Sequence, residues 1–222
     1  MKQHYMLDEK QKTLLEYLCG LYRQNTPIPS LKAISGELGY GVASLRELME
    51  VPKALGIISS SPHKGITFQK YSFTPAVVTS LSYAINTNQD NFWQYAQVRR
   101  VIEESFFVDA AKLLSDSDVT ELNQIVMSAS EKMNMDPIQI PHIEHRQFHL
   151  KIYSQINNIF IKGILEGYWH VYEEFGLNIY SNLEYLHKVW DFHKRVVMAI
   201  QERDYSKAQF WLIAHMGLIS QR

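Results

Sequence analysis

Apolar residues recur every three or four positions in the first segment of the chain, residues 8–24, as in TLLEYLCGL. This spacing puts them on one side of a helix. After a break at NTPIPS, the same pattern predicts two shorter helices, over residues 31–39 and 42–56. Ser30 should cap the first of these, and Pro52 should interrupt or kink the second.

Two short strands should follow, IISS (57–60) and ITFQ (66–69), joined by SPHKG into a small hairpin. A helix, a glycine-containing turn, a second helix and a hairpin are the layout of a winged helix-turn-helix. We therefore predict such a domain over residues 1–70.

From Ser72 onward nearly every segment has helical period, and strand signals are few. We predict an all-α helical bundle over residues 75–222, with the domain boundary near 68–74, so the chain as a whole is mainly α. The predicted helices cover residues 74–87, 90–114, 117–133, 140–155, 158–175, 182–203 and 205–220.

Composition narrows the class of protein only a little. The chain has 222 residues, 46% of them hydrophobic, with a formal net charge of −1. Residues 1–70 hold nine Lys/Arg against six Asp/Glu (net +3), and the remainder holds 13 against 17 (net −4). A mildly basic front on an acidic body hints at an anionic partner for the front.

Neither a signal peptide nor a membrane-spanning run is recognisable, so we expect a cytoplasmic protein with no membrane partner. The single cysteine, Cys19, excludes an intrachain disulfide. Because it lies in an apolar helical stretch, we expect a thiol buried in the core.

In a winged helix-turn-helix the second helix of the motif enters the major groove of double-stranded DNA, and the wing reaches the backbone or minor groove. Backbone N–H groups at helix starts can also hold phosphates. The alternative is a packing domain whose charges are merely solvated. The residues that would face DNA are Ser30, Lys32, Val42, Ser44, Arg46, His63, Lys64 and Gly65.

Three predicted helices of the back domain each carry a histidine within an apolar stripe: His149, His193 and His215. His145 lies one helical turn before His149, on the same face. A buried imidazole without partners costs about 1–3 kcal/mol. Each could bond a backbone carbonyl or a tyrosine, but four together favour convergence on one metal ion, for which imidazole is a common ligand.

The front of the chain resembles the DNA-binding domain of the GntR family of bacterial transcription regulators. The resemblance lies in Pro-Ser at 29–30, Leu-Gly at 38–39, Leu-Arg-Glu at 45–47, Leu-Gly-Ile at 55–57 and the wing glycine, Gly65. Lys32 and Val42 stand where the family usually has arginines. Since only arginine bonds a guanine in bidentate fashion, a different operator is expected.

The back domain resembles the FCD ligand-binding domain of the FadR-like branch of that family. Metal-binding members carry Asp-x-x-x-His and two later histidines, and His149, His193 and His215 match the three histidines. His145 stands in place of the aspartate. The site could be all-histidine, Glu144 could supply the carboxylate, or the metal could be lost. We favour an all-histidine site, which selects softer divalent transition metals, Zn or Ni above all.

The resemblance implies a ligand-responsive transcription regulator, not an enzyme, that binds a palindromic operator as a homodimer. Its effector would be a small carboxylate on the metal, with Arg99, Glu103 and His142 also around it. Two alternatives stay open. A His-rich metalloenzyme could use Glu144 or Glu103 as base, and a direct metal sensor would have the ion itself as its effector.

Overall fold

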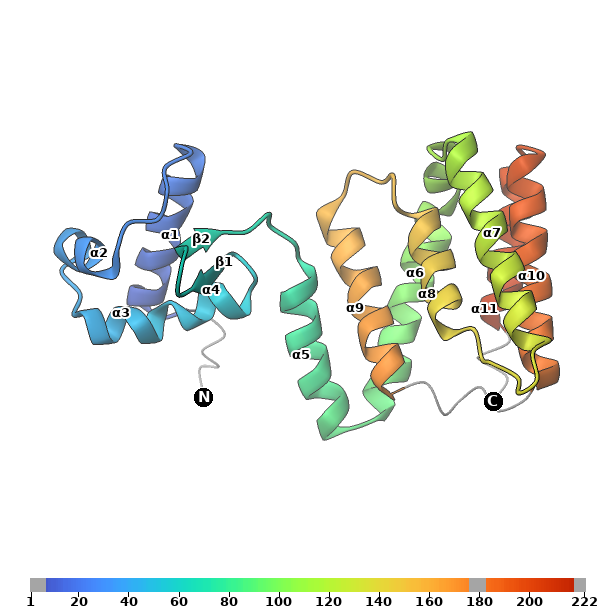
Figure 1. Cartoon of the computed structure of the whole chain (residues 1–222), viewed down its shortest axis with the longest axis horizontal. Coiled ribbons are helices and arrows are strands. Elements are labelled where there is room, and N and C mark those ends of the chain that lie inside the picture. The colour runs from blue at the N-terminus through green and yellow to red at the C-terminus, as the bar shows by residue number, and fades with distance from the viewer. Residues whose placement is uncertain (1–6, 176–182, 218–222) are drawn as a thin grey trace. The chain divides into compact units, whose positions relative to one another are not determined.

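The computed structural model describes residues 7–175 and 183–217, which form two compact units, residues 1–79 and 80–222 (Figure 1). The predicted fold class is confirmed: the chain is mainly helical, with one two-stranded antiparallel hairpin. No helix in the described ranges is long and apolar enough to cross a membrane.

The first unit begins with α1 (Glu9–Arg23), capped by Asp8 in a reciprocal capping box with Gln11. α2 (Leu31–Leu38) starts at Ser30, whose hydroxyl accepts the backbone N–H of Ala33 at 3.3 Å. It ends at Gly39, whose φ of +70° is a left-handed conformation that glycine adopts without strain.

α3 (Val42–Leu48) and α4 (Glu50–Ala54) form two short helices where the sequence predicted one kinked helix. The interruption predicted near Pro52 comes at Met49, three residues before it. Pro52 has no N–H to donate to the carbonyl of Leu48, so one helix cannot run through both residues, and Pro52 instead lies in the first turn of α4, where no internal donor is needed.

The wing consists of β1 (Ile58–Ser61) and β2 (Gly65–Phe68), paired from Ile58 opposite Phe68 to Ser61 opposite Gly65. A single apolar core holds the unit together, formed by Leu14, Leu18, Ile34, Leu45, Leu48, Met49 and Ile58.

The prediction that Cys19 is buried was wrong, since the thiol is exposed. The apolar stripe of α1 faces the core, where Leu14 and Leu18 are buried. A residue directly after Leu18 points about 100° away from that stripe, because an α-helix turns by that angle per residue.

The second unit is a bundle of α-helices. α5 (Thr74–Thr87) contains the boundary between the two units and leads into α6 (Asp90–Lys112) and α7 (Asp116–Met133). The remaining helices are α8 (His142–Ile152), α9 (Ile159–Phe175), α10 (Leu183–Gln201) and α11 (Tyr205–Gly217). The helix start predicted at residue 182 and the helix end predicted at residue 220 fall outside the described residues.

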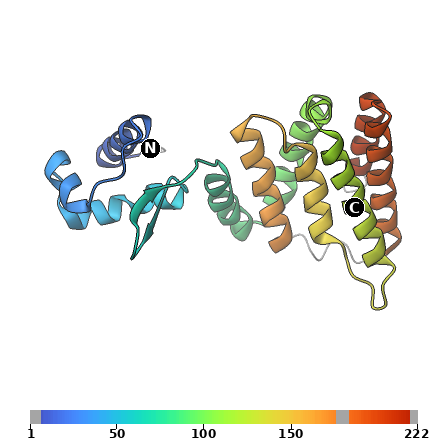
Figure 2. The ribbon, with the colours of Figure 1, turned by 45° about the horizontal axis from the view of Figure 1, so that its top comes forward.

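Six of these helices close a ring around one core. α8 packs on α7, α7 on α10, α10 on α11, α11 on α6, α6 on α9 and α9 back on α8 (Figure 2). The core they enclose is rich in aromatic side chains, including Tyr168, Trp169 and Tyr172. Polar groups placed inside this ring are therefore cut off from water.

Candidate metal centre and nucleic-acid interface

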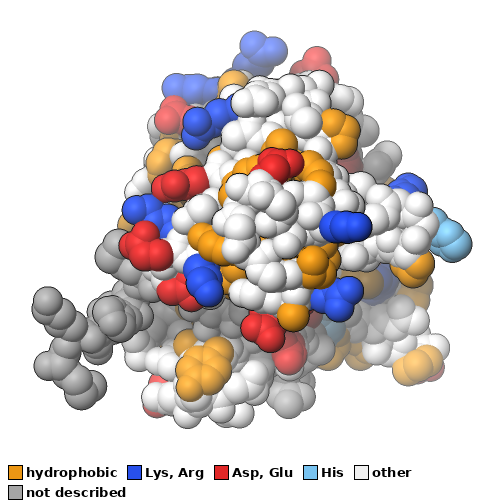
Figure 3. All heavy atoms as spheres, turned by 90° about the vertical axis from the view of Figure 1, so that its left-hand side faces the viewer, with side chains coloured by type: hydrophobic (Ala, Val, Ile, Leu, Met, Phe, Trp, Pro, Cys, Tyr) orange, Lys and Arg blue, Asp and Glu red, His pale blue; other side chains and the backbone are white. Residues whose placement is uncertain are grey.

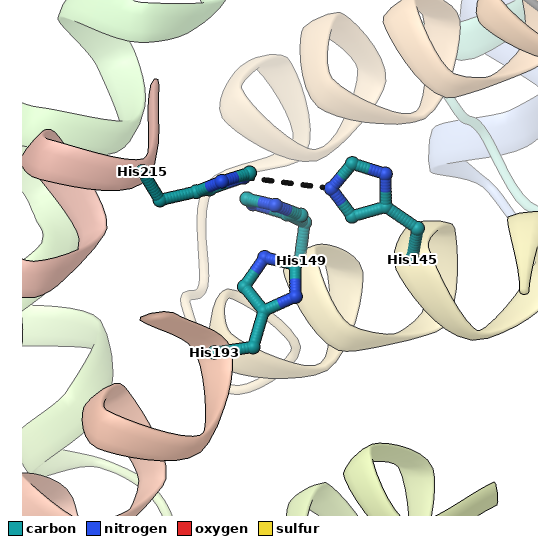
Figure 4. Close-up of side chains that lie close together, drawn as sticks. All are labelled: His145, His149, His193 and His215. Carbon is teal, nitrogen blue, oxygen red and sulfur yellow. Dashed lines mark hydrogen bonds between the residues drawn. The ribbon is translucent and has the colours of Figure 1, made fainter. Parts of the chain in front are cut away.

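The four predicted histidines meet inside the ring of helices. His145 and His149 project from one face of α8, His193 comes from α10 and His215 from α11 (Figure 4). Each offers one ring nitrogen to a common space, and these four atoms lie within 4.8 Å of one another. Nε2 of His145 and Nε2 of His215 are 3.5 Å apart.

Burial makes the cluster costly without a further ligand. His149, His193 and His215 are fully buried, and His145 is 6% exposed. Nε2 of His149, Nδ1 of His215 and both ring nitrogens of His193 find no hydrogen-bond partner within the described ranges. Such orphaned polar atoms each cost about 1–3 kcal/mol, and a metal ion would satisfy them.

The donor set fits a divalent transition metal. Four nitrogens bonded at about 2.0–2.1 Å to a tetrahedral ion lie roughly 3.3 Å apart, so the cluster would contract slightly around one. Burial lowers the pKa of all four imidazoles well below 6.5, and the neighbouring Arg99 charge lowers it further. The rings are therefore neutral at pH 7, the form that ligates metals.

A buried charge pair lies directly behind His149. Nε and Nη2 of Arg99 bond the two carboxylate oxygens of Glu103 at 2.9 and 3.0 Å. Nδ1 of His149 lies 2.9 Å from Nη2 of Arg99 and 3.2 Å from Oε2 of Glu103. Nδ1 can accept from Arg99 or donate to Glu103, depending on the tautomer. Metal ligation through Nε2 requires the tautomer with the proton on Nδ1, which then donates to Glu103, and a carboxylate behind a ligating imidazole is a common way to fix that tautomer.

Aromatic rings complete the setting of this pair. The Arg99 guanidinium lies 4.4 Å from the ring centroid of Tyr168 and 4.6 Å from that of Trp169, both on α9. These cation–π contacts help to offset the burial of a charge. Both rings were missing from the sequence prediction, because nothing in an aromatic-rich helix shows which of its rings will face an arginine on another helix.

Glu144 and His142 lie elsewhere. Oε1 of Glu144 bonds Nζ of Lys132 at 2.7 Å and the hydroxyl of Ser128 at 3.1 Å, which holds the carboxylate toward α7. These bonds outweigh burial and lower the pKa of Glu144. His142 lines an outer groove beside Glu144. Among the described residues, the ligand atoms that converge are thus the four imidazoles, without Glu144.

The front unit brings together half of the residues predicted to face DNA. Ser30, Arg46, Lys64 and Gly65 line one concavity of about 700 Å³ between the start of α2, the end of α3 and the wing. Lys53 also lines it, paired at 2.6 Å with Glu50, and no pattern in the sequence singled out this lysine. The other predicted residues do not line it: Lys32, Val42, Ser44 and His63.

On the face of the molecule that Figure 3 shows, positive charge is spread out. In Figure 3, Lys and Arg side chains lie among acidic, apolar and uncharged ones and do not form one continuous patch. Three cations lie close together in the concavity, beside the N-terminus of α2: Arg46, Lys53 and Lys64. This arrangement suits phosphate contacts more than a broad electrostatic attraction.

A winged helix-turn-helix joined to a helical bundle with a buried polar cluster defines the class of transcription regulators that couple a DNA reader to a sensing domain. The family model for the FCD domain matches residues 94–218, more than half of the chain. The chain therefore belongs to the FCD family of GntR-type transcription regulators, which confirms the predicted family. Because members of this family are regulators, the prediction that the chain is not an enzyme is confirmed as well.

Solved structures agree on the fold. A GntR protein of Streptococcus agalactiae aligns with a TM-score of 0.66 at 14% identity, over 97% of this chain and 100% of that one. McbR/YncC of E. coli aligns with a TM-score of 0.51 at 18% identity, over 86% and 84% of the chains. Lar, which controls expression of the Listeria monocytogenes agr system, gives 0.52 at 14% identity, over 96% and 95%. None of the curated proteins compared with the chain matches it.

Proposed function

We propose that this regulator binds a divalent transition metal through His145, His149, His193 and His215, and that the metal centre senses a small carboxylate effector. The observation that carries the proposal is the convergence of four buried, neutral imidazoles, of which His149, His193 and His215 have ring nitrogens without a hydrogen-bond partner among the described residues. Buried polar atoms in a folded core nearly always have a bonding partner, and here a bound metal would be that partner.

The identity of the ion decides whether an effector can reach it. Four protein ligands complete a tetrahedral zinc site, which is the closed pattern of structural zinc. An octahedral ion such as Ni²⁺ would keep two positions for small molecules after binding four imidazoles. We propose Zn or Ni, and elemental analysis of freshly purified protein distinguishes them. Protein that carries no transition metal, with wild-type stability in chelator, would contradict the metal centre.

A carboxylate effector would take an open position on such an ion, within reach of Arg99. Glu103 already neutralises the Arg99 charge and takes two of its five N–H donors, so the effector must use another N–H of Arg99 or bind the ion alone. His142 lies on the outer side of α8 and could only border the route of entry. A thermal-shift screen of small carboxylic acids, on metal-loaded and metal-stripped protein, tests this step.

On the DNA side, we propose that a homodimer places two front units on a palindromic operator in the bacterial cytoplasm. The grouping of Ser30, Arg46, Lys64 and Gly65 around one concavity supports the surface. Binding of the purified protein to genomic fragments should weaken in Arg46→Ala and Lys64→Ala. Lys112→Ala, at an exposed position in the other unit, is the matched control.

If Lys64 contacts only phosphate, its loss should lower the slope of log affinity against log salt by about one unit on every sequence. Wild-type affinity in both variants would show that the wrong surface had been chosen.

A direct metal sensor is the second candidate, and the closed four-imidazole set favours it if the ion is zinc. In that case chelator alone should change DNA binding and no carboxylate should do so. An effector sensor predicts the reverse: a carboxylate that changes DNA affinity only while the metal is bound.

A further inference from the structure

α8 has a second face, turned away from the histidines, that lines a groove. α7, α8 and α9 lie side by side (Figure 2), and a groove of about 1170 Å³ runs over α8 between its two neighbours. The side chains of α8 that line it, such as Ile143, Arg146 and Leu150, are not those that face the metal cluster. The groove is therefore separate from the site described above.

Ion pairs across the groove show how the helices run. Glu144 near the start of α8 meets Lys132 near the end of α7, and Lys151 near the end of α8 meets Asp118 near the start of α7. On the other side, Arg146 bonds Glu173 near the end of α9, with Nη1 3.1 Å from both carboxylate oxygens. Both neighbours are thus antiparallel to α8, and Glu144 marks one end of the groove.

One carboxylate oxygen of Glu144 lacks a hydrogen-bond donor from the described ranges of the chain. The residue is 6% exposed and lines the groove. Its Oε1 is engaged by Lys132 and Ser128, while its Oε2 is buried and has no partner among the residues that the structure describes, so a donor in the groove reaches it when the side chain turns outward. A carboxylate oxygen only accepts hydrogen bonds, and a charged one bonds a cationic donor most strongly.

The rest of the groove fits a ligand with a positive head and an apolar body. Ile125 and Leu165 are buried beneath it, Leu150 is half-buried, and Ile143 is 58% exposed. The charges of its lining residues and their partners leave one surplus negative charge. The carboxylates number five and the Lys/Arg four: Asp118, Glu121, Glu144, Glu166 and Glu173 against Lys132, Arg146, Lys151 and Lys162.

We infer that this groove is a binding site for an aliphatic ammonium compound. Its ammonium group donates a hydrogen bond to Oε2 of Glu144, and its hydrocarbon chain lies along α8 over Ile125 and Leu150. Since α8 carries metal ligands on its inner face, a bound amine presses on the same helix from outside. The inference does not rest on the proposed metal centre.

The test uses three probes with the same six-carbon chain and different heads: hexylamine, 1-hexanol and hexanoate. Each is titrated calorimetrically into the full-length protein, metal-loaded and metal-stripped. We expect hexylamine to bind once per chain in both forms, at least about tenfold more tightly than the alcohol. Equal binding of hexylamine and 1-hexanol would overturn the inference. Binding that requires the metal would also overturn it, because an amine can ligate the ion directly.

Two variants locate the site. Glu144→Gln keeps the shape of the side chain and should weaken hexylamine by about tenfold or more. Glu131→Gln, at an exposed position of α7 outside the groove, removes the same charge and should leave binding unchanged. Equal losses in both variants would mean general attraction to an acidic surface and would refute the site.

Should Glu144→Gln disturb folding, Ile143→Lys provides a second measurement. Ile143 is exposed on the groove wall, so lysine is tolerated there by the helix and brings a like charge beside the bound ammonium. We expect hexylamine binding to fall by about tenfold while metal content stays at the wild-type level. Unchanged hexylamine affinity in Ile143→Lys would place the amine elsewhere.

Discussion

At the scale of single residues, His193 shows most clearly what the core lacks. It is fully buried on α10, its ring lies against Phe148 and Trp190, and neither nitrogen has a partner in the described part of the chain. A leucine there would pack without that cost. A ligand that bonds the ring would explain why a histidine stands there. The effect of replacing His193 on the free energy of unfolding should then change sign with the presence of metal.

His193→Leu should therefore act in opposite directions in two forms of the protein. In metal-stripped protein, the free energy of unfolding should equal or exceed that of wild type, by up to about 1–3 kcal/mol, because orphaned nitrogens are removed. In metal-loaded protein, the variant should lose the stabilisation that bound metal gives to wild type. Chemical denaturation with and without chelator measures both.

The control for this change is His170→Leu, since His170 is exposed on α9 and outside the cluster. Its unfolding should respond to chelator as wild type does. A His193→Leu protein that is less stable than wild type by the same amount in both forms would make the histidine a packing residue.

Glu103→Gln tests the carboxylate behind His149. The amide keeps an oxygen for Arg99 but is a weaker acceptor for the Nδ1–H of His149, so metal affinity should fall by about 10–100-fold. Competition with a fluorescent chelator measures the affinity. Glu104→Gln, the adjacent carboxylate that pairs with Arg100, is the control and should bind metal like wild type. Equal affinities in the two variants would remove Glu103 from the metal site.

At the scale of secondary-structure elements, caps and short ion pairs fix where helices begin. Asp118 belongs to the capping box of α7 and also accepts hydrogen bonds from Lys151 at the end of α8. The bond from Lys151, then that from Ser115, lowers the pKa of Asp118 well below its usual value near 3.8. One buried carboxylate thus ties together the ends of two helices.

A carboxyl whose pKa is lower in the folded state stabilises the fold above its unfolded pKa, and this stabilisation is lost as the pH falls through the folded value. Asp118→Asn should lower the free energy of unfolding by about 1–3 kcal/mol at pH 7 and flatten its fall below about pH 4. Denaturant melts across that range measure it. Asp116→Asn, exposed in the same turn, should keep the wild-type profile.

Gly56, just after the end of α4, lies close to Pro75 at the start of α5 within the first unit. Its φ is +67°, and an added Cβ would lie 2.7 Å from Cγ of Pro75. Gly56→Ala should therefore destabilise this unit by more than about 1 kcal/mol in thermal unfolding. Gly20→Ala, inside α1 with nothing within 4 Å, should instead stabilise it by about 0.5–1 kcal/mol. The opposite order would contradict the close approach.

The helices were predictable to within about three residues because their apolar stripes have the right period and some of their starts carry capping residues. Ser30 and Asp116 illustrate this, as N-cap and first residue of their helices. The interruption of the helix was predictable from Pro52, but its position at Met49 was not. The convergence of four histidines followed from stripes on three helices. The partners of Arg99 and the groove over α8 depend on how separate helices pack, which spacing along one chain does not contain.

At the scale of the whole molecule, the metal cluster draws on α8, α10 and α11, so an effector at the ion acts on three helices of the ring together. For such an effector the coupling to operator binding should be about 1–3 kcal/mol, or roughly 5- to 150-fold in DNA affinity. The effect must be reciprocal, with DNA changing effector affinity by the same factor. Titrations of each partner in the presence of the other measure the two factors.

Carboxylic acids that stabilise metal-loaded and metal-stripped protein equally would make the metal structural. Acids that require the metal yet leave DNA affinity unchanged would break the link between the site and regulation. Either result would leave the family assignment intact and would favour the metal ion itself as the effector.

The position of the ligands along the chain has one further consequence. His145 and His215 are 70 residues apart, so an ion that joins them closes a long loop in the way a disulfide does in secreted proteins, and closure of longer loops stabilises a fold more. An ion present at 100 times its dissociation constant adds about 2.7 kcal/mol to stability. Since cellular proteases remove unfolded chains, a difference of that size changes abundance several-fold. The cell's supply of metal would then set how many copies of the regulator survive, in addition to what each copy senses.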